Sequence, residues 1–250
     1  MPINETIQSG EEAHDIFKIL LAATPSDKQD EEANWATFGD TLLTVFAHDN
    51  HEEDPGKKWL TSDCVQTIYD IAQQAASERL RAIAIAEIAF IGMREQHRES
   101  ALQTLSSILK NPELPESQRG GAAGSMVHIC EYVPEACAYT VNTLAGVISD
   151  KDVLPDVRVA AAVEIFMAGR AKQALVSNLS PDSIDSLIAT LKGDDDLKIR
   201  HYAGILLNYG AESSEEHNAK IAPLADLIAT NHDEFVRIYM KPDNGPSPSA

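Results

Sequence analysis

The chain contains four copies of one short pattern, spaced roughly 40 residues apart. Each copy has arginine as its second residue, alanine three residues later and a large apolar residue four residues after that. The copies read LRAIAIAEIAFIG from Leu80, QRGGAAGSMVHIC from Gln118, VRVAAAVEIFMAG from Val157 and IRHYAGILLNYGA from Ile199. A unit of this length cannot bury its apolar face alone and must stack on its neighbours, so the pattern predicts a solenoid.

The shared positions divide into three sets. The arginines are Arg81, Arg119, Arg158 and Arg200; the alanines are Ala84, Ala122, Ala161 and Ala203; the large apolar residues are Ile88, Met126, Ile165 and Leu207. The segment Asp233 to Arg237 looks like the start of another copy. The alanines allow paired helices to approach closely, because a larger side chain would push the helices apart.

Helical spacing of apolar residues continues between the copies, and no sustained alternation of apolar and polar residues indicates a strand. Proline followed by an acidic residue marks helix starts at Pro115, Pro134, Pro155 and Pro181. We therefore expect an all-α fold. The specific prediction is one right-handed α-α superhelix of about six antiparallel helix pairs, beginning near residues 12, 62, 98, 135, 181 and 219.

The segment PDVRVAAAVEIF, from Pro155 to Phe166, resembles the second helix of a HEAT repeat, within the HEAT and armadillo-like class of solenoids. DDDLKIRHYAGILL and DEFVRIYM are weaker versions, and the resemblance covers roughly residues 60–240. It implies that acidic residues in the turns and arginines at the starts of second helices form a structural ladder. The implied pairs are Asp156 with Arg158, Asp196 with Arg200 and Asp233 with Arg237; near Arg81 and Arg119 the acid is glutamate.

Charge and cysteine content restrict the partners and the compartment. The chain has 39 acidic and 20 basic residues, a net charge of −19, which opposes binding to a phosphate backbone and so to nucleic acid. It has no apolar run long enough for membrane insertion. The three widely spaced cysteines, Cys64, Cys130 and Cys137, are typical of buried thiols in a reducing compartment, which predicts a cytoplasmic location.

The two ends of the chain differ from its middle. Residues 1–60 hold thirteen acidic and four basic residues and lack the repeat arginine, so we expect an atypical acidic helix pair that caps the solenoid. The HEAT-like repeats are expected over 61–240. The Pro-, Gly- and Ser-rich segment 241–250 is expected to be a disordered tail.

Two alternatives to a binding module stay open. His48 and His51, three residues apart among acidic residues, form a candidate metal site, although the HExxH spacing of zinc hydrolases is missing. HEAT-like di-iron hydroxylases carry repeated His-Glu pairs, and only His51-Glu52 is present here. A prosthetic-group lyase or chaperone, such as the HEAT-like bilin lyases, would need a reactive exposed cysteine. No catalytic residue or cofactor is predicted.

We favour a third interpretation, in which the surface of the second helix of each pair binds a protein partner. In solenoids of this kind the second helices line the concave side, where a partner lies along the groove. The candidate groove residues form one stripe beside the alanine core and are Glu87, Phe90, His128, Glu164, Met167, Tyr202 and Tyr209. Aromatic and methionine side chains beside carboxylates favour apolar anchoring of a positively charged protein or peptide. We therefore predict a non-catalytic protein-binding scaffold.

Overall fold

The computed structural model describes residues 7–52 and 58–240, and of Arg170 only the backbone. Throughout these residues the chain is helical and contains no strand, which confirms the all-α prediction. The chain divides into two compact units, Met1–Ile129 (unit 1) and Cys130–Ala250 (unit 2). The segment 241–250, expected to be a disordered tail, lies outside the described residues.

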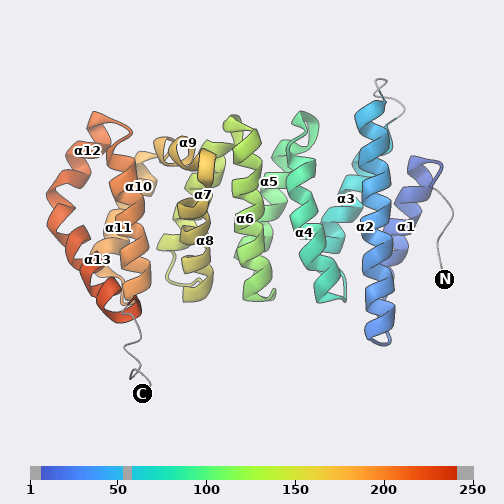
Figure 1. The fold of residues 1–250 in the computed structure, drawn as a ribbon, viewed down its shortest axis with the longest axis horizontal. Coiled ribbons are helices and arrows are strands. Elements are labelled where there is room, and N and C mark those ends of the chain that lie inside the picture. Colours follow the sequence, from blue (N-terminus) through green and yellow to red (C-terminus); the bar gives the residue numbers. More distant parts are fainter. Residues whose placement is uncertain (1–6, 53–57, 241–250) are drawn as a thin grey trace, which may run out of the picture. The chain divides into compact units, whose positions relative to one another are not determined.

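The described part of unit 1 consists of consecutive helices (Figure 1). They are α1 (Gly10–Ala22), α2 (Lys28–His51), α3 (Ser62–Gln74), α4 (Glu78–Gly92), α5 (Glu95–Lys110) and α6 (Glu116–Tyr132), whose last residues belong to unit 2.

Unit 2 also consists of consecutive helices, with short 3₁₀ helices between some of them (Figure 1). Its elements are η2 (Pro134–Ala136), α7 (Cys137–Ser149), α8 (Pro155–Met167), η3 (Gly169–Ala171), α9 (Lys172–Ser177), α10 (Pro181–Gly193), α11 (Leu197–Ala211), α12 (Glu215–Ile221), η4 (Ala222–Leu224) and α13 (Ala225–Tyr239).

Helix starts follow the local chemistry of the sequence. Pro155 and Pro181 occupy the first positions of α8 and α10, where a missing N–H costs no hydrogen bond. The hydroxyl of Ser180 then accepts a hydrogen bond from the N–H of Ser183, and the hydroxyl of Ser77 does the same for Leu80. The starts expected at Pro155 and Pro181 are therefore confirmed, whereas Pro134 begins the 3₁₀ helix η2 and Pro115 immediately precedes α6.

Within each unit the helices form two layers. In unit 1, α1 packs on α3 in one layer and α2 packs on α4 in the other. In unit 2, α7 packs on α10, while α8 and α13 flank α11 (Figure 1). The helices of the second layer, which are α2 and α4 in unit 1 and α8, α11 and α13 in unit 2, are the second members of their pairs. They are called the second helices below, together with α6.

The aligned alanines and large apolar residues form the core of these pairs. All four alanines and all four large apolar residues are completely buried: Ala84, Ala122, Ala161, Ala203, Ile88, Met126, Ile165 and Leu207. Burial of each large side chain stabilises the fold by about 1.5–3 kcal/mol. The repeat in the sequence is thus a repeat of core positions.

The repeat arginines bind the carboxyl ends of the preceding helices. Arg119 and Arg158 are buried, and each Nε donates a hydrogen bond to the carbonyl ten residues earlier, at 2.9 Å to Leu109 and 2.7 Å to Ile148. Arg200 instead uses Nη1 for the Asp194 carbonyl, at 2.7 Å. These carbonyls have no partner inside their own helix and lie at the negative end of its dipole.

Arg81 and Arg200 also reach the following repeat. Arg81 Nε donates to the side-chain oxygen of Gln118 at 3.0 Å, and its Nη1 donates to the Ala75 carbonyl. Arg200 Nε donates to the side-chain oxygen of Asn231 at 2.8 Å. In both links the neighbour supplies a neutral amide rather than a carboxylate.

The acidic partners of the arginines differ from the implied ladder. Asp156 is exposed, and Arg158 pairs instead with the buried carboxylate of Asp194, which follows α10. The Asp196 carboxylate accepts from the N–H of Lys198 at 2.7 Å and caps α11. Asp is a favourable residue at this position because it satisfies an N–H that the helix leaves unbonded.

The last copy also differs from the expectation. Arg237 does not begin a second helix: it lies in the last turn of α13 and approaches Glu234 at 3.9 Å, with both side chains exposed. Asp233 is exposed as well. The start of α13 at Ala225 places Asn231, rather than an arginine, against the preceding repeat.

Helix α9 was not expected from the sequence. This six-residue helix lies between α8 and α10 and lengthens the interval between Arg158 and Arg200, the longest between successive repeat arginines. It follows Gly169, whose φ of 47° favours glycine because side chains with a Cβ rarely adopt it.

Candidate protein-binding site

A cavity of about 500 Å³ opens between three second helices of unit 2. Helix α8 contributes Phe166, and the remaining lining comes from α11 and α13. The α11 residues are Ile205, Asn208 and Tyr209, and the α13 residues are Ala225, Ile228, Ala229 and His232. The lining is mainly apolar, because it consists of two aromatic rings, two isoleucines and two alanines. The two remaining residues, Asn208 and His232, are polar and can orient a bound chain.

Phe166 and Tyr209 bring the aromatic rings of two helices together. Their centroids are 6.5 Å apart with the planes tilted by 41°. The Lys172 ammonium, at the start of α9, lies 4.4 Å from the Phe166 centroid and 5.0 Å from that of Tyr209. A cation over these rings is attracted by their negative faces. Lys172 therefore supplies this cation from within the chain.

His232 joins the cavity to a second aromatic cluster. Its ring stacks on His201 with centroids 5.2 Å apart, and His201 in turn stacks on Phe235 at 3.9 Å. His201 is buried, and its Nδ1 has no hydrogen-bond partner. Burial, together with the neighbouring His232, lowers the pKa of His201 to about 4. This histidine is therefore neutral at physiological pH.

Of the predicted groove residues of unit 2, only Tyr209 lines the cavity. Tyr202 lies two turns earlier on α11, where its ring packs edge-on against Phe235 at 6.0 Å. Met167, which follows Phe166 at the end of α8, has 67% of its surface exposed. Glu164 is half-buried, and burial raises the pKa of its carboxyl.

In unit 1 the structure brings two predicted groove residues together. The rings of Phe90 on α4 and His128 on α6 meet nearly at right angles, with centroids 5.7 Å apart. Phe90 is 49% exposed. Glu87 on α4 is half-buried, and burial raises the pKa of its carboxyl.

Several cavity residues were missed by the sequence analysis. Met167 was predicted to face the groove, but its sequence neighbour Phe166 lines the cavity instead. The predicted position was therefore wrong by one residue along the helix. Ile228 and His232 were missed because the last repeat was expected to begin its second helix near Asp233, whereas α13 begins at Ala225. Leu224 and Ile228, four residues apart, were the available signal that this segment is helical before Asp233.

His48, the first histidine of the candidate metal site near the end of α2, contacts neighbouring side chains. The His48 ring stacks on Trp59 with centroids 3.9 Å apart, and its Nδ1 lies 3.4 Å from Asp49. The buried Asp49 carboxylate also accepts hydrogen bonds from the N–H groups of Trp59 and Leu60 and from Arg94.

The Asp49 carboxylate beside His48 is therefore already held by hydrogen bonds within the chain. His51 is exposed, and no group of three or more potential metal ligands lies together in the part of the chain that the structure describes. The acidic residues 53 and 54 of the candidate site lie outside that part.

The cysteines have the environment of core residues. All three thiols are buried, and burial raises the pKa of each, for Cys130 to about 12. Because the thiolate is the nucleophile, a thiol of such high pKa reacts slowly at neutral pH. A lyase mechanism through an exposed cysteine therefore has no suitable residue among these three.

Comparison with models of known protein families finds no match, and comparison with curated proteins finds no relative. Among the helices in the described ranges, none combines the length and the apolarity needed to cross a bilayer.

Proposed function

We propose that this protein is a non-catalytic binding scaffold that holds a segment of another protein along its second helices. The observation that carries the proposal is the open, mainly apolar cavity between α8, α11 and α13, which has room for a large apolar side chain. Apolar pockets of this kind hold the few anchor residues that dominate binding energy.

The chemistry of the partner follows from the cavity and from the charge. Lys172 already lies over the rings of Phe166 and Tyr209, so the cavity is suited to an apolar rather than a cationic anchor. The net charge of −19 attracts a positively charged segment at long range and repels nucleic acid. The proposed partner segment is therefore basic and carries one exposed apolar or aromatic residue.

We also propose that the helix pairs stack as a HEAT-like, right-handed superhelix. The in-phase burial of the repeat alanines and the arginine bonds to preceding helices support this arrangement. In a superhelix the second helices of successive repeats face one side, which extends the surface available to a partner. The acidic pair of residues 1–60 would cap it, and the predicted location is cytoplasmic.

The test fills the cavity without changing charge. Ala229 lines the cavity and is exposed, so Ala229→Trp places an indole in the space. Ala219, equally classed as exposed but on α12 and outside the lining, provides the matched control Ala219→Trp. Each purified variant is used as bait in extracts of the source cells, and captured proteins are quantified by mass spectrometry.

We expect a set of proteins that the natural chain and Ala219→Trp retain equally and that Ala229→Trp loses. The direct interaction is then measured with the purified candidate, whose binding should weaken about tenfold or more with the filled cavity. Identical protein sets on all three baits, or recovery of nucleic acid in place of protein, would contradict the proposal.

A further inference from the structure

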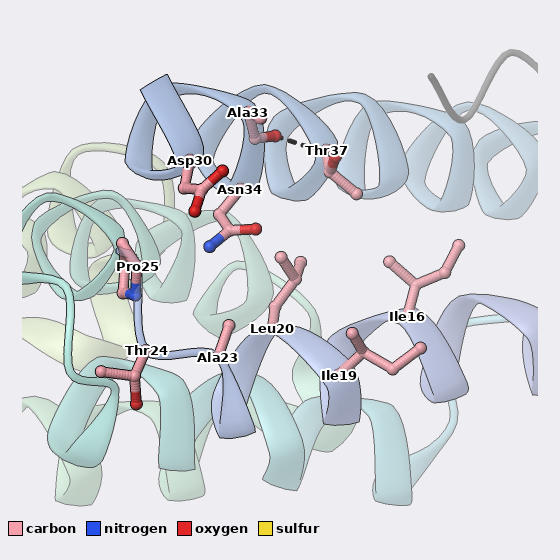
Figure 2. A pocket seen from close by; sticks show the side chains of 10 residues that line it. All are labelled: Ile16, Ile19, Leu20, Ala23, Thr24, Pro25, Asp30, Ala33, Asn34 and Thr37. Atoms are coloured by element: carbon pink, nitrogen blue, oxygen red, sulfur yellow. Dashed lines mark hydrogen bonds between the residues drawn. The ribbon is translucent and has the colours of Figure 1, made fainter. Parts of the chain in front are cut away.

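A second apolar cleft lies at the other end of the chain, between α1 and α2 (Figure 2). It has a volume of about 430 Å³ and is lined on one side by Ile16, Ile19 and Leu20. Figure 2 shows Leu20 and Ile16 directed toward α2, and Asn34 directed back from α2 toward α1. The remaining lining residues are Ala23, Thr24, Pro25, Asp30, Ala33 and Thr37.

The cleft is open on the side away from α3 and α4. Helix α1 packs on α3 and helix α2 packs on α4, so the inner faces of this pair are covered, for example at the fully buried Phe17 and Phe38. Ile19, by contrast, has 69% of its surface exposed although it lines the cleft. Large apolar side chains exposed around a cleft mark interaction surfaces.

The shape of the cleft fits a helix. Two consecutive helices joined by a short turn form a helical hairpin, and the groove between them accepts the ridge of a third helix. The α2 lining runs from Asp30 to Thr37, about 10 Å along the helix, which matches about two turns of a partner helix. Recognition of an amphipathic helix in an apolar groove is a recurring binding mode.

The negative charge around the cleft favours a positively charged partner. Helices α1 and α2 together hold eight acidic residues and only two lysines, Lys18 and Lys28. Asp30 lies in the lining itself, and Glu12, Glu32 and Asp40 are exposed on the same two helices. A second copy of this chain would bring like charges together, whereas a helix rich in lysine or arginine would be attracted.

We propose that the α1/α2 cleft is a docking site for a basic amphipathic helix of a partner protein. The partner's apolar stripe packs on Ile16, Ile19 and Leu20, and its cationic residues face the carboxylates of α1 and α2. This site is separate from the cavity in unit 2 and does not depend on the function proposed for that cavity.

The probe is a fluorescein-labelled peptide of about 18 residues, built from leucine and lysine with the leucines on one helical face. A second peptide has glutamate in place of every lysine. The variant Ile19→Gln removes the apolar anchor without adding charge. Leu43 is matched in exposure, 70% against 69%, but does not line the cleft, so Leu43→Gln is the control.

Fluorescence anisotropy with the full chain measures binding. We expect the lysine peptide to bind the natural chain and Leu43→Gln within about twofold, and Ile19→Gln about fivefold or more weakly. The glutamate peptide should not bind. Affinity for the lysine peptide should fall as salt is raised, because attraction between exposed charges is screened.

Three results would overturn the inference. Equal binding by Ile19→Gln and Leu43→Gln would mean that net charge alone attracts the peptide. Weaker binding by Ala229→Trp but not by Ile19→Gln would place the peptide in the unit 2 cavity instead. Sedimentation showing a dimer that Ile19→Gln dissociates would make a second copy the occupant.

Discussion

Arg158 donates a hydrogen bond to the carboxylate of Asp194, 36 residues further along the chain, and both side chains are buried. Burial by itself raises the pKa of Asp194, but the bonds from Arg158 and from the Asp196 N–H outweigh it, so the pKa is lowered. The Asp194 carbonyl also accepts a bond from Arg200. Asp194 thus joins two of the repeat arginines.

Replacing Asp194 should therefore destabilise unit 2. Asp194→Ala leaves the buried Arg158 guanidinium without its counter-charge, a loss that costs about 3 kcal/mol in the free energy of unfolding. The neighbouring Asp195 is exposed, so Asp195→Ala should change this free energy by less than about 0.5 kcal/mol. Urea denaturation of both variants measures the difference, and similar stabilities would mean that the pair contributes little.

The buried His201 predicts a pH dependence of stability. Its pKa is about 4 in the folded chain, against a usual value of 6.5, so between these values the unfolded chain binds a proton that the folded chain does not. The contribution of His201 to stability is therefore complete above pH 6.5 and is lost as pH falls toward 4, by up to about 3 kcal/mol. The variant His201→Phe keeps a ring against Phe235 but cannot titrate.

The difference in unfolding free energy between the natural chain and His201→Phe should accordingly change with pH. We expect the variant to gain relative stability as pH is lowered from 7 to 4.5, measured by urea denaturation at each pH. A difference that stays constant over this range would show that His201 is protonated equally in the folded and unfolded chains.

Two glycines should respond oppositely to alanine. A Cβ on Gly10 would lie 2.9 Å from the backbone Cα of Trp59, so Gly10→Ala should force that segment to shift and cost about 1–2 kcal/mol. A Cβ on Gly39, within α2, would meet nothing within 4 Å. Gly39→Ala should stabilise the chain by about 0.5–1 kcal/mol because alanine favours the helix. Thermal unfolding compares the two variants directly.

The thiols should be protected from labelling. Cys64, Cys130 and Cys137 are buried, and the pKa of each is raised, so an aromatic disulfide reagent should modify them slowly in native buffer at neutral pH. All three should react rapidly in urea. Immediate reaction of one thiol without denaturant would reopen the possibility of cysteine chemistry in the folded chain.

Sequence periodicity predicted the helices because burial repeats with the helical period. Ala84 and Ile88 sit four residues apart, both completely buried, and their counterparts in the other copies are buried as well. The helix starts were predictable for a local reason, since Pro155 and Ser180 act on the first turn of their own helix. The helix α9 was not predictable in this way, because its six residues form fewer than two helical turns and an apolar spacing cannot recur over so short a segment.

The binding surface was less predictable because it depends on side-chain direction and on neighbouring helices. Tyr209 was predicted, but Phe166 was missed for its neighbour Met167, since one residue corresponds to about 100° around a helix. Arginine partners were also uncertain from spacing. The carboxylate that meets Arg158 follows a different helix, so only the packing of α8 on α11, which in turn packs on α10, reveals Asp194 as its partner.

The repeat arginines form hydrogen bonds over limited distances in the sequence, which affects the order in which the chain folds. Arg81, Arg158 and Arg200 bond to residues 37, 36 and 31 positions later, so the three helix pairs that hold these arginines are each linked to the following stretch of chain. Folds built from contacts that are near in sequence pass quickly through their transition state. On a ribosome, each of these three pairs would acquire its link as soon as the following helices are synthesised, so each unit would fold progressively as it emerges.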